Sequence, residues 1–163
     1  MTEDKYKRPG WDDYFLEIVD VVSKRGTCDR GRTAAIIVRD KKILTTGYVG
    51  SPIGLPHCDD VGHMMKKVLH PDGTTHQHCV RTIHGEMNAI LQAARAGISI
   101  DRATIYCKLV PCHVCAQAII NVGIKRVVCK IGYHGATETR NLFKEAGVEL
   151  TVLDDKLEEY PDQ

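Results

Sequence analysis

The sequence predicts a layered α/β domain in which helices pack against a sheet. In the second half of the 163-residue chain, strand-like segments alternate with segments of helical periodicity, a pattern typical of such layers. Hydrophobic residues make up 43% and charged residues 26% of the chain, which is an ordinary balance for a globular protein. The length suits one hydrophobic core. Because no repeat or linker interrupts it, we predict a single domain over residues 1–163.

The first part of the chain predicts one helix followed by a hairpin. Apolar residues recur at helical spacing over residues 11–25. Residues 33–38 are rich in strand formers, the charged residues 40–42 turn the chain, and residues 43–48 return as a second strand. Glycines and prolines over residues 47–56 then break regular structure.

Residues 57–80 form an unusual segment with little apolar periodicity. The segment holds five histidines and two cysteines, and we expect it to be an irregular loop. A loop of this length is uncommon in a compact domain unless other interactions hold it in place, and metal binding by these side chains would do so.

From His84 onward the pattern is regular again and predicts three helices and three strands. The first helix ends before Gly97, and its predicted inward face carries Ile83, Met87, Ile90, Leu91 and Ala94. The later elements are a strand over 103–109, a helix over 111–122, a strand over 126–131, a helix over 138–146 and a strand over 148–153. The polar residues 154–163 are expected to fray.

Charge and cysteine content narrow the class of protein. A net charge of +1 argues against a basic nucleic-acid-binding surface. The apolar runs are too short to cross a membrane, and residues 1–5 do not resemble a signal peptide. We therefore expect a cytoplasmic protein with neither nucleic-acid nor membrane partners. Seven cysteines in such a protein indicate metal binding rather than disulfides.

Two short motifs, each at the predicted start of a helix, carry the chemistry. One holds His84 and Glu86, and the other holds Pro111, Cys112 and Cys115. Cysteines three apart at a helix start lie on one side of the first turn, where the helix dipole stabilises thiolates. With His84 they make three zinc ligands and leave a fourth position for water, which is typical of catalytic zinc. Glu86 is predicted to shuttle protons.

Each motif is weak by itself, since C-x-x-C also occurs in structural zinc knuckles and redox pairs. In this order, H-x-E followed by P-C-x-x-C is the signature of zinc nucleobase deaminases. The combination predicts hydrolytic replacement of an exocyclic amine by oxygen.

The chain resembles the deoxycytidylate (dCMP) deaminase family of the cytidine deaminase-like superfamily from about residue 11 to residue 153. The resemblance rests on both motifs and on segments around them. These are Cys28-Asp29-Arg30, Gly47 to Pro52 with Gly54, His57-Cys58-Asp59, Cys79 to Ile90, Pro111 to Cys115, and Gly123-Ile124 leading to Tyr133.

The resemblance implies a three-layer α/β/α fold with a five-stranded mixed sheet, and conversion of dCMP to dUMP for thymidylate synthesis. It also implies a homo-oligomer, often a hexamer, with dCTP as activator and dTTP as inhibitor. His84, Cys112 and Cys115 are the implied zinc ligands and Glu86 the implied acid–base residue.

We predict substrate contacts from Ser51, Asn88 and Tyr133, of which Tyr133 matches a position expected near the nucleotide. The sequence departs from the family twice: the usual His-Ala-Glu is His-Gly-Glu, and Val49 replaces a common asparagine expected to touch the nucleotide. Valine offers no side-chain hydrogen bond, so backbone groups or Ser51 would make that contact.

The resemblance also implies a second, structural zinc, because Cys28, Cys58 and Cys79 match positions where some members hold one. His63 is the predicted fourth ligand. The other candidates for that position are His78, His57 and His70. Such a site would fix the insert at about residues 57–80. The alternative is a set of buried free thiols and surface imidazoles.

Other functions compatible with the sequence are a zinc deaminase acting on cytidine, dCTP or guanine, and a non-catalytic zinc-binding regulatory protein. Glu86 argues against the latter, because a structural site has no use for an acid–base carboxylate. Arg95, two helical turns from Asn88, is either close to a substrate phosphate or an ordinary surface arginine.

Overall fold

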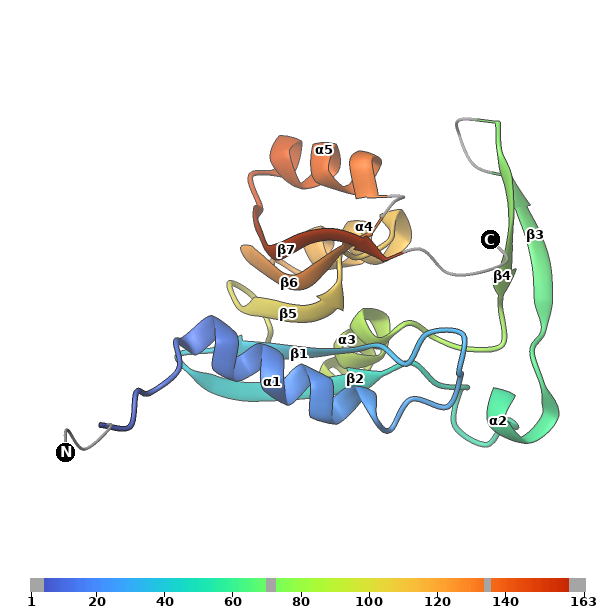
Figure 1. Cartoon of the computed structure of the whole chain (residues 1–163), viewed down its shortest axis with the longest axis horizontal. Helices are drawn as coiled ribbons and strands as arrows, with labels where there is room; N and C mark the ends of the chain where they lie inside the picture. Colours follow the sequence, from blue (N-terminus) through green and yellow to red (C-terminus); the bar gives the residue numbers. More distant parts are fainter. Residues whose placement is uncertain (1–4, 70–72, 134–135, 159–163) are drawn as a thin grey trace.

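A computed structural model of the chain describes residues 5–69, 73–133 and 136–158, with only the backbone described for residue 133 and residues 155–158. Its elements form two sheets and five helices within these residues (Figure 1). The helices are α1 (Trp11–Ser23), α2 (Cys58–Val61), α3 (Gly85–Ala96), α4 (His113–Asn121) and α5 (Thr137–Ala146). The strands are β1 (Ala34–Arg39), β2 (Lys42–Tyr48), β3 (Met65–Leu69), β4 (Thr75–Cys79), β5 (Thr104–Leu109), β6 (Arg126–Tyr133) and β7 (Glu149–Glu158).

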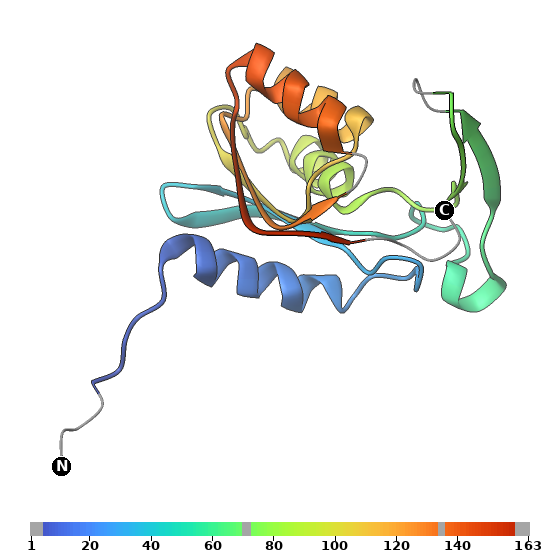
Figure 2. The same ribbon diagram turned by 45° about the horizontal axis from the view of Figure 1, so that its top comes forward.

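The main sheet has five strands in the order β2-β1-β5-β6-β7. β1 runs antiparallel to both β2 and β5, whereas β5, β6 and β7 are mutually parallel neighbours. Helices cover both faces, with α1 alone on one and α3, α4 and α5 on the other (Figure 2). The three-layer fold and the five-stranded mixed sheet are therefore confirmed.

Strand β1 shows how the two faces of the sheet are filled. Ala34, Ile36 and Val38 lie in the hydrophobic cluster that includes Phe15 and Val19 of α1. The alternate residues of β1 join the larger cluster beneath α3, α4 and α5. Since successive side chains of a strand point to opposite faces, a strand buried on both sides reads as a continuous apolar run.

Two glycines allow α3 to lie very close to the sheet. A Cβ atom at Gly47 of β2 would be 2.2 Å from the Ala89 nitrogen, and one at Gly85 would be 2.8 Å from the Ala34 Cα. These distances leave no room for a side chain at either position. The start of α3, which carries Glu86, is thus seated directly on β1 and β2.

Because α3 packs so closely on the sheet, its buried face differs from the predicted one. The buried residues are Gly85, Glu86, Ala89, Ile90 and Ala93, whereas Leu91 is 46% exposed and Ala94 is exposed. The prediction that Leu91 and Ala94 face inward was wrong. Apolar periodicity alone missed the small residues that make the close approach possible.

The expectation of an irregular loop over residues 57–80 was also wrong. The segment contains α2 and an antiparallel hairpin of β3 and β4, which form their own two-stranded sheet. This hairpin, called the arm below, extends beside the main sheet (Figure 1). Its strands escaped prediction because nearly every described side chain of β3 is exposed, so no apolar alternation marks them.

The last strand is longer than predicted. β7 continues to Glu158, where the structure pairs it with Tyr133 at the end of β6. Backbone pairing needs no apolar side chains, so the polar residues from 154 to 158 join the sheet instead of fraying. Residues 159–163 lie outside the described part. No helix among the described residues combines the length and apolar character required to cross a membrane.

Candidate active site and a second Cys–His cluster

The N-termini of α3 and α4 bring the two sequence motifs together. His84 occupies the N-cap position of α3 and Cys112 that of α4, with Cys115 in the first turn of α4. The Nδ1 atom of His84 lies 3.4 Å from the Cys112 sulfur and 3.6 Å from the Cys115 sulfur. The three residues predicted to bind the catalytic zinc therefore lie together in the structure.

These separations fit a tetrahedral metal ion. With Zn–S bonds of about 2.3 Å and Zn–N bonds of about 2.0–2.1 Å, the ligand atoms of a tetrahedral site lie about 3.5–3.8 Å apart. The three donor atoms all lie within 4.8 Å of one another. One nitrogen and two sulfurs at these spacings are a donor set that suits zinc.

The three donor residues shift one another's pKa values. The Cys115 thiol and His84 both stabilise the Cys112 thiolate and lower the pKa of Cys112 to about 3. The hydrogen bond with Cys112 in turn raises the pKa of His84 to about 9. The Cys112 sulfur at the N-terminus of α4 thus carries the negative charge, while the pKa of its partner Cys115 is raised by the hydrogen bond between them.

Glu86 lies beside the three donor atoms without joining them. It is in the first turn of α3, is only 7% exposed, and lines the same pocket as His84 and Cys112. Burial raises its pKa, an effect partly offset by His84. A buried carboxyl with a raised pKa holds a proton more readily, which suits it to accepting and returning one.

The pocket is a cavity of about 160 Å³. Besides the residues just described, its wall comes from the loop after α1, from β4 and from the end of β5. The lining residues are Cys28, Arg30, Gly31, Thr33, Val49, Gln77, His78, Cys79, Thr82, His84, Glu86, Leu109, Val110 and Cys112.

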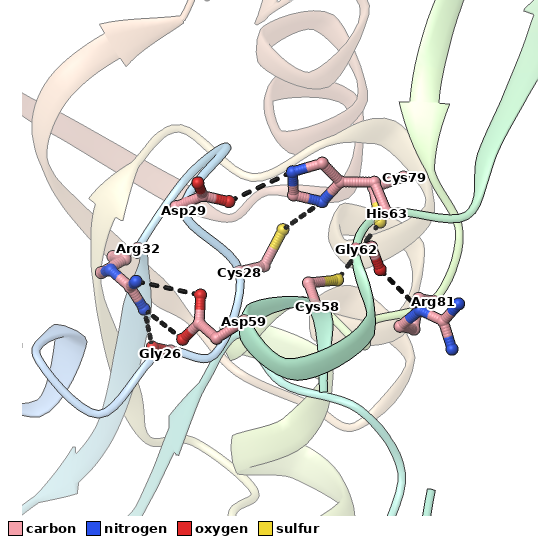
Figure 3. Close-up of polar contacts among 10 residues, drawn as sticks. All are labelled: Gly26, Cys28, Asp29, Arg32, Cys58, Asp59, Gly62, His63, Cys79 and Arg81. Carbon is pink, nitrogen blue, oxygen red and sulfur yellow. Dashed lines mark hydrogen bonds and ion pairs between the residues drawn. The ribbon is translucent and has the colours of Figure 1, made fainter. Parts of the chain in front are cut away.

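A second group of donors adjoins this pocket. Cys28, Cys58, His63 and Cys79 lie with their donor atoms within 4.8 Å of one another. The Cys28 sulfur is 3.7 Å from His63 Nδ1, and the sulfurs of Cys58 and Cys79 are 3.6 Å apart. Figure 3 shows the four side chains facing one another from three separate segments. These four residues are called the second cluster below.

His63 is oriented for a metal by a partner that sequence reasoning missed. Its Nδ1 faces Cys28, while its Nε2 lies 3.1 Å from a carboxylate oxygen of Asp29 (Figure 3). Metal-binding histidines commonly hold a carboxylate with the second ring nitrogen. No sequence signal identified Asp29, because its role depends on the direction of a loop side chain.

Two arginines beside the second cluster are committed to protein partners. Arg32 makes two hydrogen bonds of 3.0 Å to the carboxylate of Asp59, and Arg81 donates to the Gly62 carbonyl at 3.1 Å (Figure 3). These bonds tie the loop after α1 and the end of β4 to the two ends of α2.

The rival ligands lie elsewhere or are not described. His78 lines the active-site pocket, and His57 precedes Cys58 as the cap of α2. His70 lies outside the described residues. The structure therefore brings His63, rather than His78 or His57, to the cysteines of the second cluster.

The residues predicted to contact the substrate, unlike the predicted zinc ligands, are not brought together at the pocket. The Asn88 amide donates to the Tyr48 carbonyl at 2.8 Å, and the Ser51 hydroxyl is buried without a partner among the described residues. Neither residue lines the pocket. The side chain of Tyr133 lies outside the description. Their contacts with substrate stay predictions.

Val49 packs as an apolar residue. It is 6% exposed and lies in a cluster with Cys28, Cys58 and Cys79. Its backbone N–H donates to the Thr33 carbonyl, and its own carbonyl accepts from the Thr27 N–H. Valine thus fills the space between the pocket and the second cluster.

Comparison with known proteins gives consistent results. The family described as "Cytidine and deoxycytidylate deaminase zinc-binding region" matches residues 9–131. ComE operon protein 2 of Bacillus subtilis is 40% identical over 148 residues, covering 91% of this chain and 74% of that protein. Deoxycytidylate deaminase of Schizosaccharomyces pombe is 34% identical over 143 residues, covering 88% of this chain but only 44% of that protein.

Among solved structures, dCMP deaminase from the cyanophage S-TIM5 in complex with dCMP and dUMP aligns with a TM-score of 0.71 and 25% identity. The alignment covers 91% of this chain and 100% of the cyanophage chain.

Proposed function

The chain belongs to the cytidine and deoxycytidylate deaminase family, and on that basis we propose that it converts dCMP and water to dUMP and ammonia. The observation that carries the proposal is one pocket wall holding a buried acid–base carboxyl, Glu86, beside the His84 and Cys112 donors. The name of the S. pombe relative and the nucleotides bound to the cyanophage enzyme support dCMP as the substrate.

His84, Cys112 and Cys115 would hold the zinc ion of this reaction. When bound, zinc would act as a Lewis acid and lower the pKa of a water molecule to about 7. The chain's contribution is to keep three donor atoms together at two helix N-termini, where thiolates are stabilised.

Glu86 moves the protons. Its carboxylate accepts a proton from the attacking water and delivers it to the ring nitrogen N3 while the oxygen bonds to C4. It then takes the second proton of that oxygen and passes it to the leaving amine. The C4–N bond breaks, ammonia departs and the C4 oxygen becomes the carbonyl of dUMP, so Glu86 ends in its starting state.

The second cluster would hold a structural zinc, which makes two zinc ions per chain. Four ligands leave no position for water, as in structural sites. The support is the spacing of the four donors and the Asp29 carboxylate behind His63. Such a cross-link joins the loop after α1, α2 and β4, and so fixes the base of the arm.

Metal analysis of wild type and of Cys58→Ser tests the second site. We expect two zinc ions per chain in the wild type and one in the variant, together with faster protease cleavage within the arm. A Cys107→Ser variant is the control, since that buried strand residue belongs to neither donor group. One zinc per chain in fully active wild-type protein would contradict the assignment.

We also propose that residues 1–163 act as one deaminase domain in the cytoplasm and assemble as a homo-oligomer, up to a hexamer. The arm supports assembly: among the strands that the structure describes, β3 and β4 pair with no third strand, and Val68 and Leu69 are 38% and 72% exposed. A lone hairpin is marginally stable in water. Activation by dCTP and inhibition by dTTP stay predictions.

Ultraviolet-monitored turnover of dCMP, cytidine, dCTP and guanine tests the substrate. With zinc present, we expect dCMP to be deaminated with the highest kcat/KM of the four. Preference for cytidine or guanine would indicate a zinc deaminase of another substrate class. Complete inactivity of zinc-loaded protein on all four would favour the regulatory alternative.

A further inference from the structure

The turn between β1 and β2 lies beside the start of α1, at the end of the main sheet away from the arm (Figure 1), and these segments line a second cavity. Its volume is about 290 Å³, compared with about 160 Å³ for the active-site pocket. Arg102 and Thr104 line this cavity at the start of β5, whereas Leu109 lines the active-site pocket at the end of that strand. The two cavities therefore lie at opposite ends of β5.

Three cationic side chains, Arg39, Lys41 and Arg102, line the second cavity, which is called the basic pocket below. Asp40 is the one acidic residue of its wall within the described part of the chain. Three cations against one carboxylate leave an excess of two positive charges. The uncharged residues of the wall are Trp11, Phe15, Val38, Thr104 and Tyr106.

None of the three cations forms an ion pair with a carboxylate of the described residues. The Lys41 ammonium lies 5.1 Å from the centre of the Trp11 ring, and the Arg102 side chain makes no hydrogen bond or ion pair in the same part of the chain. Arg126 of β6 differs, because it is paired with Asp12 at 2.8 Å. The positive charge of the basic pocket is thus available to an anion from solution.

Two of the cations occupy backbone positions that favour other residue types. Lys41 and Arg102 both have a φ of 60°, in the left-handed region that glycine and asparagine adopt most readily. Lys41 is the second residue of the two-residue turn between β1 and β2, where glycine is common. Binding of an anion accounts for charged side chains at positions where glycine would fold more easily.

Arg39 fixes the loop that carries Arg102. Its Nη1 donates to the carbonyls of Ser99 and Asp101, at 3.0 and 3.1 Å, while the Arg102 N–H donates to the Gly123 carbonyl at 2.9 Å. The Nη2 and Nε donors of Arg39 have no partner among the residues that the structure describes. The backbone on either side of the basic pocket is therefore held in place before any ligand arrives.

From this arrangement we propose that the basic pocket binds a diphosphate group, either as free pyrophosphate or as part of a larger molecule. A diphosphate carries more than one negative charge near neutral pH, which matches the excess positive charge of the wall. Arginine presents a planar set of donors that pairs with phosphate oxygens. A single carboxylate would leave part of that charge unpaired and would fill little of the cavity. The proposal is independent of the deamination of dCMP.

Trp11 makes binding directly observable, because it is the single tryptophan of the sequence. Zinc-loaded protein is titrated with pyrophosphate at constant ionic strength. Since the Lys41 ammonium lies over the Trp11 ring, an anion that binds Lys41 should change the tryptophan fluorescence until the site is saturated. We expect a Kd below about 1 mM, measured in parallel by calorimetry. No saturable binding would overturn the inference.

ADP distinguishes the two sources of the diphosphate. ADP that binds at least as tightly as pyrophosphate would assign the site to a diphosphate within a larger molecule. Binding of pyrophosphate alone would assign it to the free anion. Both results support a diphosphate site.

Lys41→Gln and Arg102→Gln locate the binding. Each should weaken pyrophosphate binding by about 10-fold in calorimetry, as for loss of a charge-assisted hydrogen bond. Lys42→Gln and Arg140→Gln are the matched controls, since both residues are exposed and line neither pocket. We expect these controls to bind pyrophosphate as the wild type does, with zinc content and kcat for dCMP unchanged in all four variants.

Equal weakening in the pocket variants and the controls, or none in either, would overturn the inference. Wild-type protein that binds pyrophosphate but does not deaminate dCMP would overturn the proposed function alone, because the binding is measured without turnover.

Discussion

At the scale of single residues, glycine at position 85 explains how Glu86 is placed. The family commonly has alanine between the histidine and the glutamate, but here a Cβ atom would lie 2.8 Å from the Ala34 Cα and 3.1 Å from the Ala34 carbonyl carbon. Backbone atoms cannot move aside as the end of a flexible side chain can. The absence of a side chain therefore sets how deeply the start of α3, with His84 and Glu86, sits against β1.

Gly85→Ala is expected to destabilise the protein and disturb the site together. Overpacking of this kind costs about 1–3 kcal/mol of unfolding free energy, and a shift of α3 would lower kcat for dCMP. Denaturant unfolding and steady-state kinetics measure the two effects. Leu91→Ala, on the exposed side of α3, should change the unfolding free energy by less than about 0.5 kcal/mol. Wild-type stability and kcat in Gly85→Ala would refute this explanation.

Residue patterns in the sequence predicted the donor atoms better than the pocket wall. His84, Cys112 and Cys115 followed from motif spacing, and the structure brings them together as expected. Arg95 was considered for the phosphate, but it is exposed and does not line the pocket. Arg30 lines it instead, and this placement could not be predicted because a loop side chain's direction has no periodic signature.

At the scale of elements, an ion-paired network attaches α1 to the sheet. Arg126 of β6 makes two hydrogen bonds to the Asp12 carboxylate, at 2.9 and 2.8 Å, and the Tyr106 hydroxyl donates to Asp12 at 2.9 Å. The hydrogen bond from Arg126 is the main cause that holds the pKa of Asp12 below its ordinary value of 3.8. This network joins the first turn of α1 to two central strands.

Asp12→Asn should therefore destabilise the protein in a pH-dependent way. A lowered pKa means that the carboxylate stabilises the folded state above pH 3.8 and that this contribution disappears as pH falls through the folded pKa. At pH 7 we expect a loss of about 1 kcal/mol, since the pair is partly exposed. Urea unfolding at a series of pH values measures it, with Asp13→Asn as control. A stability difference that is independent of pH would contradict the role assigned to the charge.

The two strands of the arm, β3 and β4, are secondary-structure elements that the sequence did not predict. Sequence periodicity predicted the strands and helices that bury side chains, but not β3 and β4, whose pairing depends on backbone hydrogen bonds and on the segments around them. The concentration of histidine and cysteine correctly identified the segment as unusual. It did not reveal the hairpin.

At the scale of the whole molecule, the sheet places both donor groups beside one pocket. Cys28 and Cys79 of the second cluster line the same wall as His84, Glu86 and Cys112. Residues from the loop after α1, from β4 and from the starts of α3 and α4 thus meet, although they are far apart in the chain. The motifs predicted which residues matter, but the sharing of one wall by the two groups required the three-dimensional structure.

The most direct test of this account is the turnover of dCMP by Glu86→Gln compared with wild type at matched zinc content. Glutamine preserves the size of the side chain but cannot accept or return a proton, so we expect kcat to fall by about 100- to 10,000-fold. Zinc content and dUMP binding should remain at wild-type levels. A Glu86→Gln variant that deaminated dCMP at the wild-type rate would contradict the proposed mechanism.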